Sequence, residues 1–283
     1  MKKSRLRKII DSLMEGGKIT MLGLYLLFTI IPFVWILITS FKGKKELFTF
    51  PIQYIPESLN FENYSYIVNV ADFPRYFMNS LLVSIVGPLM GLLIGIFAAY
   101  VICNFQFKSK KHVMMAFFLT QMLPGIAGFA PMYVLLAKLG MLDKLTTVAM
   151  LYMGGQVPFS TITLIGFFKR IPKSLEEAAL IDGANRLQSL YYVILPLLKP
   201  GIFTVFIFGF INCWNEIFTA ALYINSDSKR TIPVAIYSFI TKYDVNWGAI
   251  SAGTIIAIIP TMILFSFMQK FLVKGIVDGA IKG

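Results

Sequence analysis

The sequence predicts an all-α, polytopic membrane protein with six transmembrane helices and both termini in the cytoplasm. The first observation is composition: of 283 residues, 57% are hydrophobic and only 14% are charged, and the mean hydropathy is +0.73. Soluble domains carry about 25% charged residues and roughly 45–50% apolar ones, and a soluble fold of this size could not bury the excess. The second observation is a set of long apolar stretches, and the third is an uneven distribution of Lys and Arg.

The apolar stretches are long enough to cross a bilayer, which takes about 20 predominantly apolar residues in a helix. The first one follows a basic segment at 2–8, as a signal peptide would. Its apolar run is too long for a signal peptide, however, and no small-x-small cleavage site follows it. We therefore expect all of these stretches to be true spans: Thr20–Ser40, Asn79–Asn104, Val113–Ala137, Leu145–Phe168, Gly201–Ile224 and Ala249–Gln269.

The Lys and Arg residues set the expected orientation. With both termini inside, the inner segments hold 17 Lys and Arg residues and the outer segments hold 9. Cytoplasmic loops are enriched in these residues because positive loops resist translocation. The same bias accounts for the net charge of +12, and no basic stripe interleaved with aromatic residues indicates nucleic-acid binding.

Residue types that carry catalytic or metal chemistry are sparse. Cys103 and Cys213 lie in apolar stretches without metal-ligand spacing and are interpreted as packing residues. With His112 as the only histidine, and with no G-x-S-x-G motif, the sequence predicts no catalytic residue, no metal site and no membrane enzyme. The chain also lacks G-x-x-x-x-G-K-[ST], so any ATP chemistry would belong to another chain, and we expect no cofactor here.

The long inner loop at 169–200 carries the most specific pattern. Ser174, with Glu177 three residues later, predicts a helix that starts with a capping box. Gly183 can take a positive φ and end that helix, and Pro196 and Pro200 mark the return to the membrane. One face of the helix is small and apolar. On these residues alone, the helix either closes the loop or receives the surface of another protein.

A family resemblance favours the second interpretation. The residues Glu177-Ala178-Ala179, then Gly183, then Val193-Ile194-Leu195-Pro196 resemble the EAA motif of bacterial ABC importer permeases, with Val193 where the family usually has Ile. In that family the loop forms a coupling helix that docks in a cleft of the ATP-binding subunit. The resemblance implies polar docking contacts for Glu177, close approach at the two alanines and a turn at Gly183. The coupling residues expected from it are Glu176, Glu177, Ala178, Ala179, Asp182, Gly183, Leu195 and Pro196.

Other segments resemble the carbohydrate-uptake class of these permeases, and specifically the smaller permease of maltose-type sugar importers. They include Ala98-Ala99-Tyr100, Gln121–Pro124, Leu195–Gly201, Trp214-Asn215 and the ending Gly279–Gly283. The resemblance implies that residues 1–283 form a single transmembrane permease domain, with 169–200 as a cytoplasmic coupling loop within it. The C-terminal tail in that family also touches the ATPase.

The resemblance also implies a function, a cellular location and a set of partner proteins. The chain would form half of the path for a sugar or oligosaccharide and would work by alternating access in a bacterial plasma membrane. Its partners would be a second homologous permease in a heterodimer, two ATP-binding subunits that carry the ATP and Mg, and an extracytoplasmic solute-binding protein. The sugar itself is not indicated.

Polar residues in the fifth predicted span form a helical pattern. Asn212, Asn215, Glu216 and Thr219 are spaced at i, i+3, i+4 and i+7, which predicts one polar stripe. Polar residues within a membrane usually face a cavity or a partner helix. The stripe is therefore a candidate wall of the solute path, and the alternative is hydrogen bonding between subunits.

The third predicted span contains helix-breaking residues. Pro124, Gly125, Gly128 and Pro131 predict a kinked or broken helix, because each proline removes a hydrogen bond and clashes with the preceding turn. The break is either a gate hinge or a static kink that accommodates neighbours.

An ion-coupled secondary transporter is the alternative function. Such a protein needs buried ionisable relays and often has internal repeats. Glu216 is the single acidic residue deep in a predicted span, and no repeat is visible, so the permease interpretation is preferred.

Overall fold

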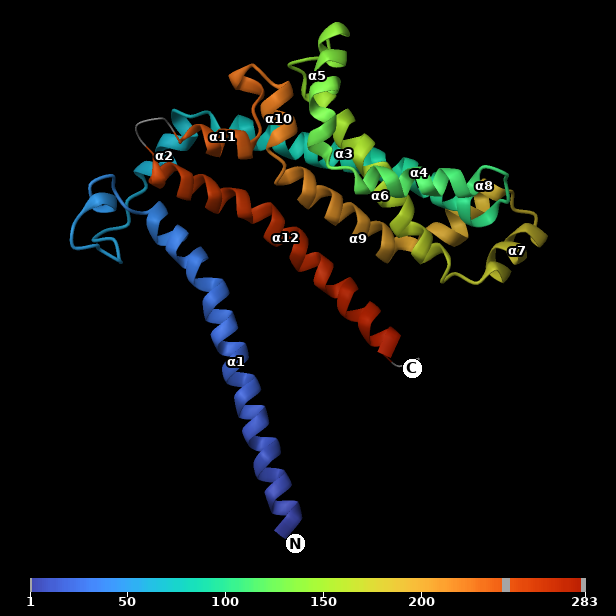
Figure 1. Ribbon diagram of the computed structural model, residues 1–283, viewed down its shortest axis with the longest axis horizontal. Helices are drawn as coiled ribbons and strands as arrows, with labels where there is room; N and C mark the ends of the chain where they lie inside the picture. The colour runs from blue at the N-terminus through green and yellow to red at the C-terminus, as the bar shows by residue number, and fades with distance from the viewer. Residues whose placement is uncertain (1, 241–244, 281–283) are drawn as a thin grey trace. The chain divides into compact units, whose positions relative to one another are not determined.

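The computed structural model describes the backbone of residues 2–240 and 245–280 and the side chains of residues 13–240 and 245–269. Within that part, all named elements are helices, with one isolated bridge between Ile240 and Val245 (Figure 1). Five helices are long and apolar enough to cross a membrane, or six if one bent pair counts as a single span. The all-α prediction is confirmed, and the predicted number of spans agrees with the second count.

The chain divides into two compact units, 1–71 with 239–256 and 72–238 with 257–283. The first unit holds α1 (Lys2–Ser40), the 3-10 turn η1 (Glu46–Phe48), α2 (Glu62–Asn69) and the start of α12 (Trp247–Ala280). The last carbonyls of a helix lack partners within the helix. Here the Asn63 amide donates to the Ser40 carbonyl at 3.0 Å and to the Lys42 carbonyl at 2.8 Å, which fixes the end of α1.

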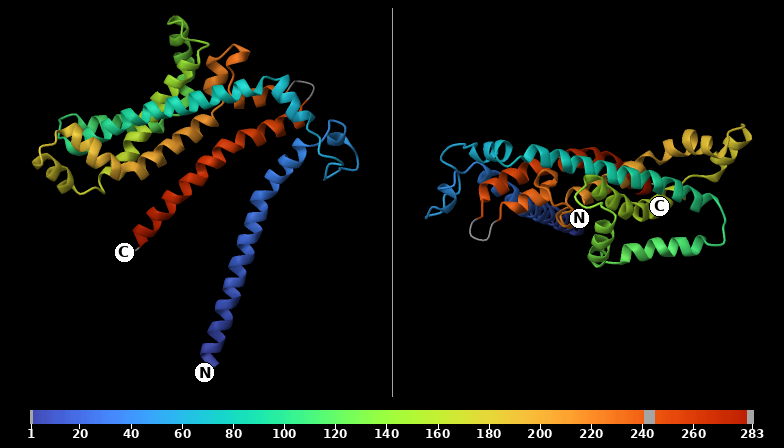
Figure 2. Two further views of the ribbon diagram at one scale, coloured as in Figure 1. Left: turned by 180° about the vertical axis from the view of Figure 1, so that it is seen from behind. Right: turned by 90° about the horizontal axis from the view of Figure 1, so that it is seen from above.

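The second unit is built on α3 (Phe73–Asn104), α6 (Leu145–Phe168) and α9 (Leu195–Trp214), which pack side by side (Figures 1 and 2). Their shared core consists of large apolar residues that are almost wholly buried, among them Leu92, Leu164, Leu198 and Val205. The predicted fourth span matches α6 residue for residue, and the second span begins six residues earlier than predicted, at Phe73.

A row of glycines brings α3 and α6 into close contact. Gly87, Gly91 and Gly95 follow one another at four-residue spacing on the α3 face that meets α6. A Cβ on Gly91 would lie 2.6 Å from the Gln156 Cβ and 2.8 Å from the Met153 carbonyl oxygen. Small residues of this kind let the backbones of two membrane helices approach closely, and the resulting van der Waals packing favours their association.

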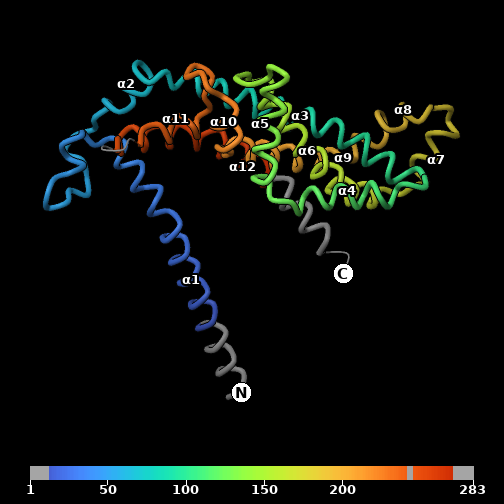
Figure 3. Tube along the Cα trace, turned by 45° about the horizontal axis from the view of Figure 1, so that its top comes forward, coloured from blue at the N-terminus to red at the C-terminus, as the bar shows by residue number. Residues whose placement is uncertain are grey.

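The third span is broken, as predicted. The helices α4 (Lys110–Met122) and α5 (Phe129–Lys138), with the 3-10 turn η2 (Gly125–Gly128) between them, are bent by 98° (Figure 3). The break falls at Pro124, where the backbone is extended. Pro131 does not contribute to it, contrary to our expectation, because it lies in the first turn of α5, where a backbone N–H has no helical partner to lose.

The fifth span differs from the prediction. The continuous helix runs from Arg186 to Trp214, as α8 (Arg186–Ser189), the π-helical turn η3 (Leu190–Ile194) and α9, so it starts earlier and ends ten residues before Ile224. The short helix α10 (Phe218–Tyr223) follows after a break. The π-helical turn ends at Ile194, two residues before Pro196. Proline has no N–H and cannot donate a hydrogen bond to the preceding turn.

The remaining described helices are α7 (Lys173–Ile181), the 3-10 turn η4 (Asp227–Lys229) and α11 (Ile232–Ser238). The predicted sixth span lies within α12, whose apolar part is Trp247–Gln269. Of the predicted C-terminal contact segment Gly279–Gly283, residues 281–283 lie outside the described residues.

The glycine row gives the first testable prediction. Gly91→Ala should lower the stability of the protein by about 1–3 kcal/mol, because the added methyl overlaps a backbone oxygen of α6 that cannot move without shifting the helix. The measurement is the fraction of detergent-solubilised protein that stays monodisperse after heating. Gly154→Ala is the matched control, since nothing lies within 4 Å of its Cβ position. Equal melting curves for the two variants would contradict the close contact.

Candidate functional site

The helix α7 at the centre of the predicted coupling loop begins differently from our expectation. Pro172 occupies the N-cap position and Ser174 lies inside the helix, so the predicted capping box of Ser174 and Glu177 is wrong. Pro172 has a fixed φ suited to the start of a helix. The helix therefore begins at Lys173, before Ser174. The capping box of this loop lies instead at α8, where the Asn185 and Gln188 side chains each accept the other's backbone N–H at 2.8 Å.

The end of α7 agrees with the prediction for Gly183. Its φ is +90°, a backbone angle that residues with a Cβ rarely adopt. The Ala184 N–H donates to the Ala179 carbonyl at 3.0 Å, and the Gly183 N–H donates to the Leu180 carbonyl at 3.2 Å. This pair of hydrogen bonds is a Schellman motif, and it turns the chain sharply toward α8.

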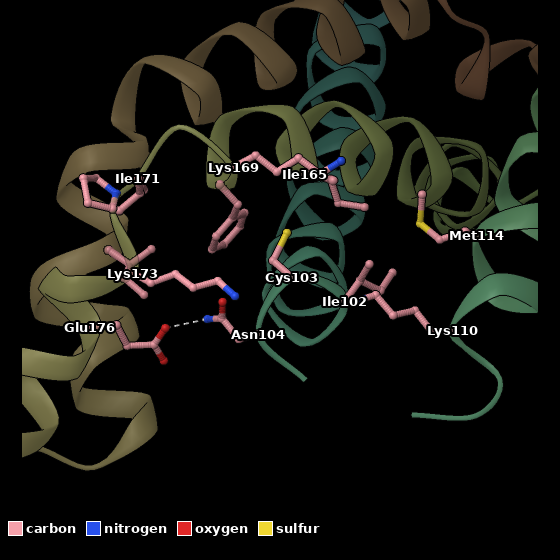
Figure 4. Close-up of a pocket in the computed structure, with 13 residues that line it drawn as sticks. Ile102, Cys103, Asn104, Lys110, Met114, Ile165, Lys169, Ile171, Lys173 and Glu176 are labelled. Atoms are coloured by element: carbon pink, nitrogen blue, oxygen red, sulfur yellow. Dashed lines mark hydrogen bonds between the residues drawn. The ribbon is translucent and has the colours of Figure 1, made fainter. Parts of the chain in front are cut away.

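Glu176 anchors α7 to the end of α3. The residue is 8% exposed, and its carboxylate accepts hydrogen bonds from the Tyr100 hydroxyl at 2.7 Å, the Asn104 amide at 2.8 Å and the Arg186 guanidinium at 3.1 Å. Figure 4 shows the contact between Asn104 and Glu176 at the edge of a cavity. These three donors hold Glu176 inward, so any part that it plays in coupling is as an anchor of α7.

The two alanines of the motif also face different ways. Ala179 is 9% exposed and lies on the same side as Glu176, three residues apart, whereas Glu177 and Ala178 are exposed. Of the two alanines expected to receive a partner, Ala178 is therefore the one that the chain leaves open to it. Asp182 and Gly183 are exposed with Glu177 and Ala178.

Leu195 and Pro196 lie apart from α7, in the first turn of α9. Leu195 packs against the core of the second unit, while Pro196 is exposed. Leu195 therefore does not share an exposed surface with the α7 residues, because its side chain packs against the core.

Sequence reasoning missed a group of exposed apolar residues in this loop. Ile181 is 86% exposed, and Leu187, Tyr191 and Tyr192 are each at least 65% exposed. Leu187, Tyr191 and Tyr192 belong to the candidate span Arg186–Trp214, whereas Ile181 lies outside every candidate span and adds a large apolar side chain to the exposed face of α7. The signal available in the sequence was their occurrence in a loop expected to lie outside the bilayer.

The predicted polar stripe of the fifth span is not one stripe. The helix α9 ends at Trp214, so the four residues do not lie on one helix. Asn212 and Asn215 are exposed, whereas Thr219 is buried on α10. The Glu216 carboxylate accepts the backbone N–H groups of Phe218 at 2.8 Å and Thr219 at 2.9 Å, and it accepts the Tyr152 hydroxyl at 3.0 Å. Glu216 therefore serves the start of α10 and links it to α6.

Two of the predicted hinge residues line a cavity together with Tyr152 and Thr219, both hydrogen-bonded to the Glu216 carboxylate. The cavity, of about 200 Å³, is lined by Gly125 and Gly128 of the broken span together with Tyr152, Thr219 and Tyr223. The structure thus brings part of the hinge set and part of the polar set to one place. Asn212 and Asn215 do not line this cavity.

Next to this cavity, Asp143 connects the loop before α6 to the loop after α10, and its backbone N–H donates to the Tyr223 carbonyl at 2.8 Å. Its carboxylate accepts the Ser226 backbone N–H at 2.8 Å and the Lys229 ammonium at 2.7 Å. These hydrogen bonds favour the charged form and hold the pKa of Asp143 well below its usual range. No cluster of three or more His, Cys, Asp or Glu residues that could hold a metal ion occurs among the residues that the structure describes.

Residues 91–278 match the family described as binding-protein-dependent transport system inner membrane component. The chain is 33% identical over 255 residues to a diacetylchitobiose uptake system permease protein of Streptomyces coelicolor, with 90% of this chain and 92% of the relative covered. It is 31% identical over 255 residues to the trehalose/maltose transport system permease protein of Thermococcus litoralis, covering 89% and 91%.

Solved structures share the fold. A chain of a bacterial ABC transporter for the import of the acidic polysaccharide alginate superposes with a TM-score of 0.81 at 23% identity, covering 92% of this chain and 96% of that chain. A chain from the same kind of transporter, in complex with a pentasaccharide-bound periplasmic protein, gives a TM-score of 0.67 at 17% identity, covering 91% and 93%.

The position of Glu176 gives the second prediction. Glu176→Gln should destabilise the 169–200 loop by about 1–3 kcal/mol, because it removes a charge-assisted hydrogen bond and leaves Arg186 without its carboxylate. Glu177→Gln is the control, since this neighbouring carboxylate is exposed. The measurement is the rate of limited proteolysis within the loop. Equal cleavage rates for the two variants would show that Glu176 does not anchor α7.

Proposed function

Because the chain belongs to the family of binding-protein-dependent transport system inner membrane components, we propose that it is one of two permeases that form the path of an ATP-driven sugar importer. The family confirms the resemblance seen in the sequence, and the chain is a multi-pass protein of the bacterial inner membrane. The substrate class is a sugar or oligosaccharide, since the relatives named above serve diacetylchitobiose and trehalose/maltose.

The partners are a second homologous permease, two ATP-binding subunits and an extracytoplasmic solute-binding protein. The name of the family and the structure solved with a periplasmic protein support the last of these. ATP hydrolysis belongs to the ATP-binding subunits, because this sequence has no phosphate-binding loop of its own. The chain itself is a non-catalytic subunit that binds no cofactor.

The observation that carries this proposal is the division of α7 into two faces. Glu176 and Ala179 attach the helix to the membrane-spanning bundle, while Glu177, Ala178 and Ile181 point away from it. A helix held on one side and free on the other can transmit the movement of a docked partner into the bundle. We assign the exposed face, with Asp182 and Gly183, to the ATP-binding subunit.

The broken spans are assigned to the solute path. The bend at Pro124 and Gly125, beside the cavity that Tyr152 and Thr219 line, is a candidate gate. Asn212 and Asn215 remain candidates for the wall of the path, because Asn212 is exposed in the last turn of α9 and Asn215 is exposed directly after it. Glu216 is assigned to support of α10, which leaves no free acidic relay for the alternative of ion-coupled transport among these residues.

The third prediction tests docking on α7. Ala178→Leu should leave the chain folded, because Ala178 is exposed, but should weaken ATPase association by roughly 5- to 150-fold if the fit is as tight as a protein interior. The measurements are the amount of this chain in the membrane, co-purification of the ATP-binding subunit, and sugar uptake in the same cells.

Two further variants complete the docking experiment. Ala178→Ser keeps the side chain small and should retain association. Ala179→Leu should instead reduce the amount of folded chain, because that alanine is packed inward. Full sugar uptake by the Ala178→Leu variant would contradict the assignment of the exposed face of α7 to a docked ATPase.

The fourth prediction tests the orientation. In a background with Cys103→Ala and Cys213→Ala, the Ser228→Cys variant should react with an impermeant thiol reagent added outside. The Ser109→Cys variant should react only after the membrane is opened, since both positions are exposed and differ only in the side expected from the Lys and Arg distribution. Outside labelling at position 109 would reverse the topology.

A further inference from the structure

A cavity of about 380 Å³ lies where three spans end in the second unit. It is bounded by the last turn of α3, the first turns of α4, the end of α6 and the start of α7 (Figure 4). Its position is therefore at the level where the apolar part of these helices meets the polar boundary of the membrane. The cavity is large enough for a small ligand or for part of a lipid.

One part of the cavity wall is apolar. Ile102 of α3, Met114 of α4 and Ile165 and Phe168 of α6 contribute to it, together with Ile194. These residues belong to the membrane-spanning helices or directly adjoin them. This wall can accept the first carbons of an acyl chain but offers no hydrogen bonds to a soluble ion.

The other part of the wall is positively charged. Lys110, Lys169 and Lys173 line the cavity, and Figure 4 shows the three side chains around Cys103 and Asn104. The carboxylate in the lining, Glu176, is already paired with Arg186 and hydrogen-bonded by two further donors. None of the three lysines forms an ion pair with a residue that the structure describes, although the Lys110 ammonium donates a hydrogen bond to the Phe105 carbonyl at 3.4 Å.

We propose that this cavity binds an anionic phospholipid of the surrounding membrane. The phosphate lies among Lys110, Lys169 and Lys173, and the start of one acyl chain lies against the apolar wall. Lysines near a membrane surface attract anionic lipid, and this attraction falls off within a Debye length. This proposal goes beyond the transport function and does not depend on which sugar is carried.

The combination of walls favours a lipid over the other anionic ligands. A soluble phosphate would use the lysines but not the apolar wall, and an acidic segment of a partner would have to enter at membrane depth. The lining also includes Pro172, Lys173 and Glu176, which start α7. A bound lipid would therefore tie the base of the docking helix to the bilayer.

Cys103 provides a reporter inside the cavity, because it is half-buried and belongs to the lining. In the Cys213→Ser background, the assembled transporter is placed in nanodiscs of phosphatidylcholine, with or without phosphatidylglycerol. The rate at which the uncharged reagent N-ethylmaleimide alkylates Cys103 is followed by mass spectrometry of the peptide. Phosphatidylglycerol should slow alkylation roughly threefold or more, as expected when most cavities are occupied.

Matched variants separate this site from a general effect of surface charge. A Lys110→Gln, Lys169→Gln, Lys173→Gln variant should lose the protection by phosphatidylglycerol. A Lys108→Gln, Lys111→Gln variant should keep it, because those lysines belong to the same loop but do not line the cavity.

Three results would overturn the proposal. One is an equal rate of alkylation with and without phosphatidylglycerol. Another is equal protection by inorganic phosphate in phosphatidylcholine alone, which would indicate a soluble anion. The third is protection that depends on the ATP-binding subunit and not on the lipid, which would assign the cavity to a protein partner.

Discussion

The close approach of α3 to α6 is the contact on which the second unit depends. Gly87, Gly91 and Gly95 remove every side chain from one face of α3, so that Gln156 of α6 fits directly against the backbone. Gln156 in turn lies against Gly209 of α9 and donates to the Val205 carbonyl at 3.3 Å. In a membrane, burial of apolar surface gives helices little reason to associate, because lipid is equally apolar. Tight packing and a few buried polar contacts therefore have to hold the three helices together.

The ends of α3 extend this arrangement to the loops. At one end, Tyr100 and Asn104 hold the Glu176 carboxylate of α7. At the other end, the Ser80 hydroxyl accepts the Ile232 N–H at 2.8 Å, and the Asn79 amide donates to the Arg230 carbonyl at 2.9 Å. One continuous helix thus connects the proposed ATPase-docking loop to the loops at the far end of the bundle. Side-chain hydrogen bonds make both connections, and such bonds fix direction as well as distance.

Some of these features could be predicted from the sequence, and the reasons differ from case to case. The limits of α6 were predictable because polar residues flank a continuous apolar run, and the break at Pro124 followed from proline geometry. The end of α9 at Trp214 was not predictable, because apolar residues resume after Asn215 and Glu216 and continue to Ile224. What ends the helix there is the Glu216 carboxylate, which takes over two backbone N–H groups that could not be left unpaired in a membrane. The opposite faces of Ala178 and Ala179 could have been predicted, because Glu176 and Ala179 share a helical face at i, i+3.

The anchoring of α7 determines how movement at its outer face reaches the spans. If a partner pulled α7 away while α3 stayed in place, the hydrogen bonds to the Glu176 carboxylate would break and leave a charge with little access to water. Hydrogen bonds to charged groups contribute about 1.5–3 kcal/mol each, and Glu176 accepts two from α3, one from Tyr100 and one from Asn104. Movement of α7 and α3 together breaks none of them. Because the glycine row joins α3 to α6 without flexible side chains between them, α6 has to follow. The path of lowest cost is thus a movement of these helices as one body, with the change in shape taken up at the breaks near Pro124 and Glu216, where the helical backbone is already interrupted.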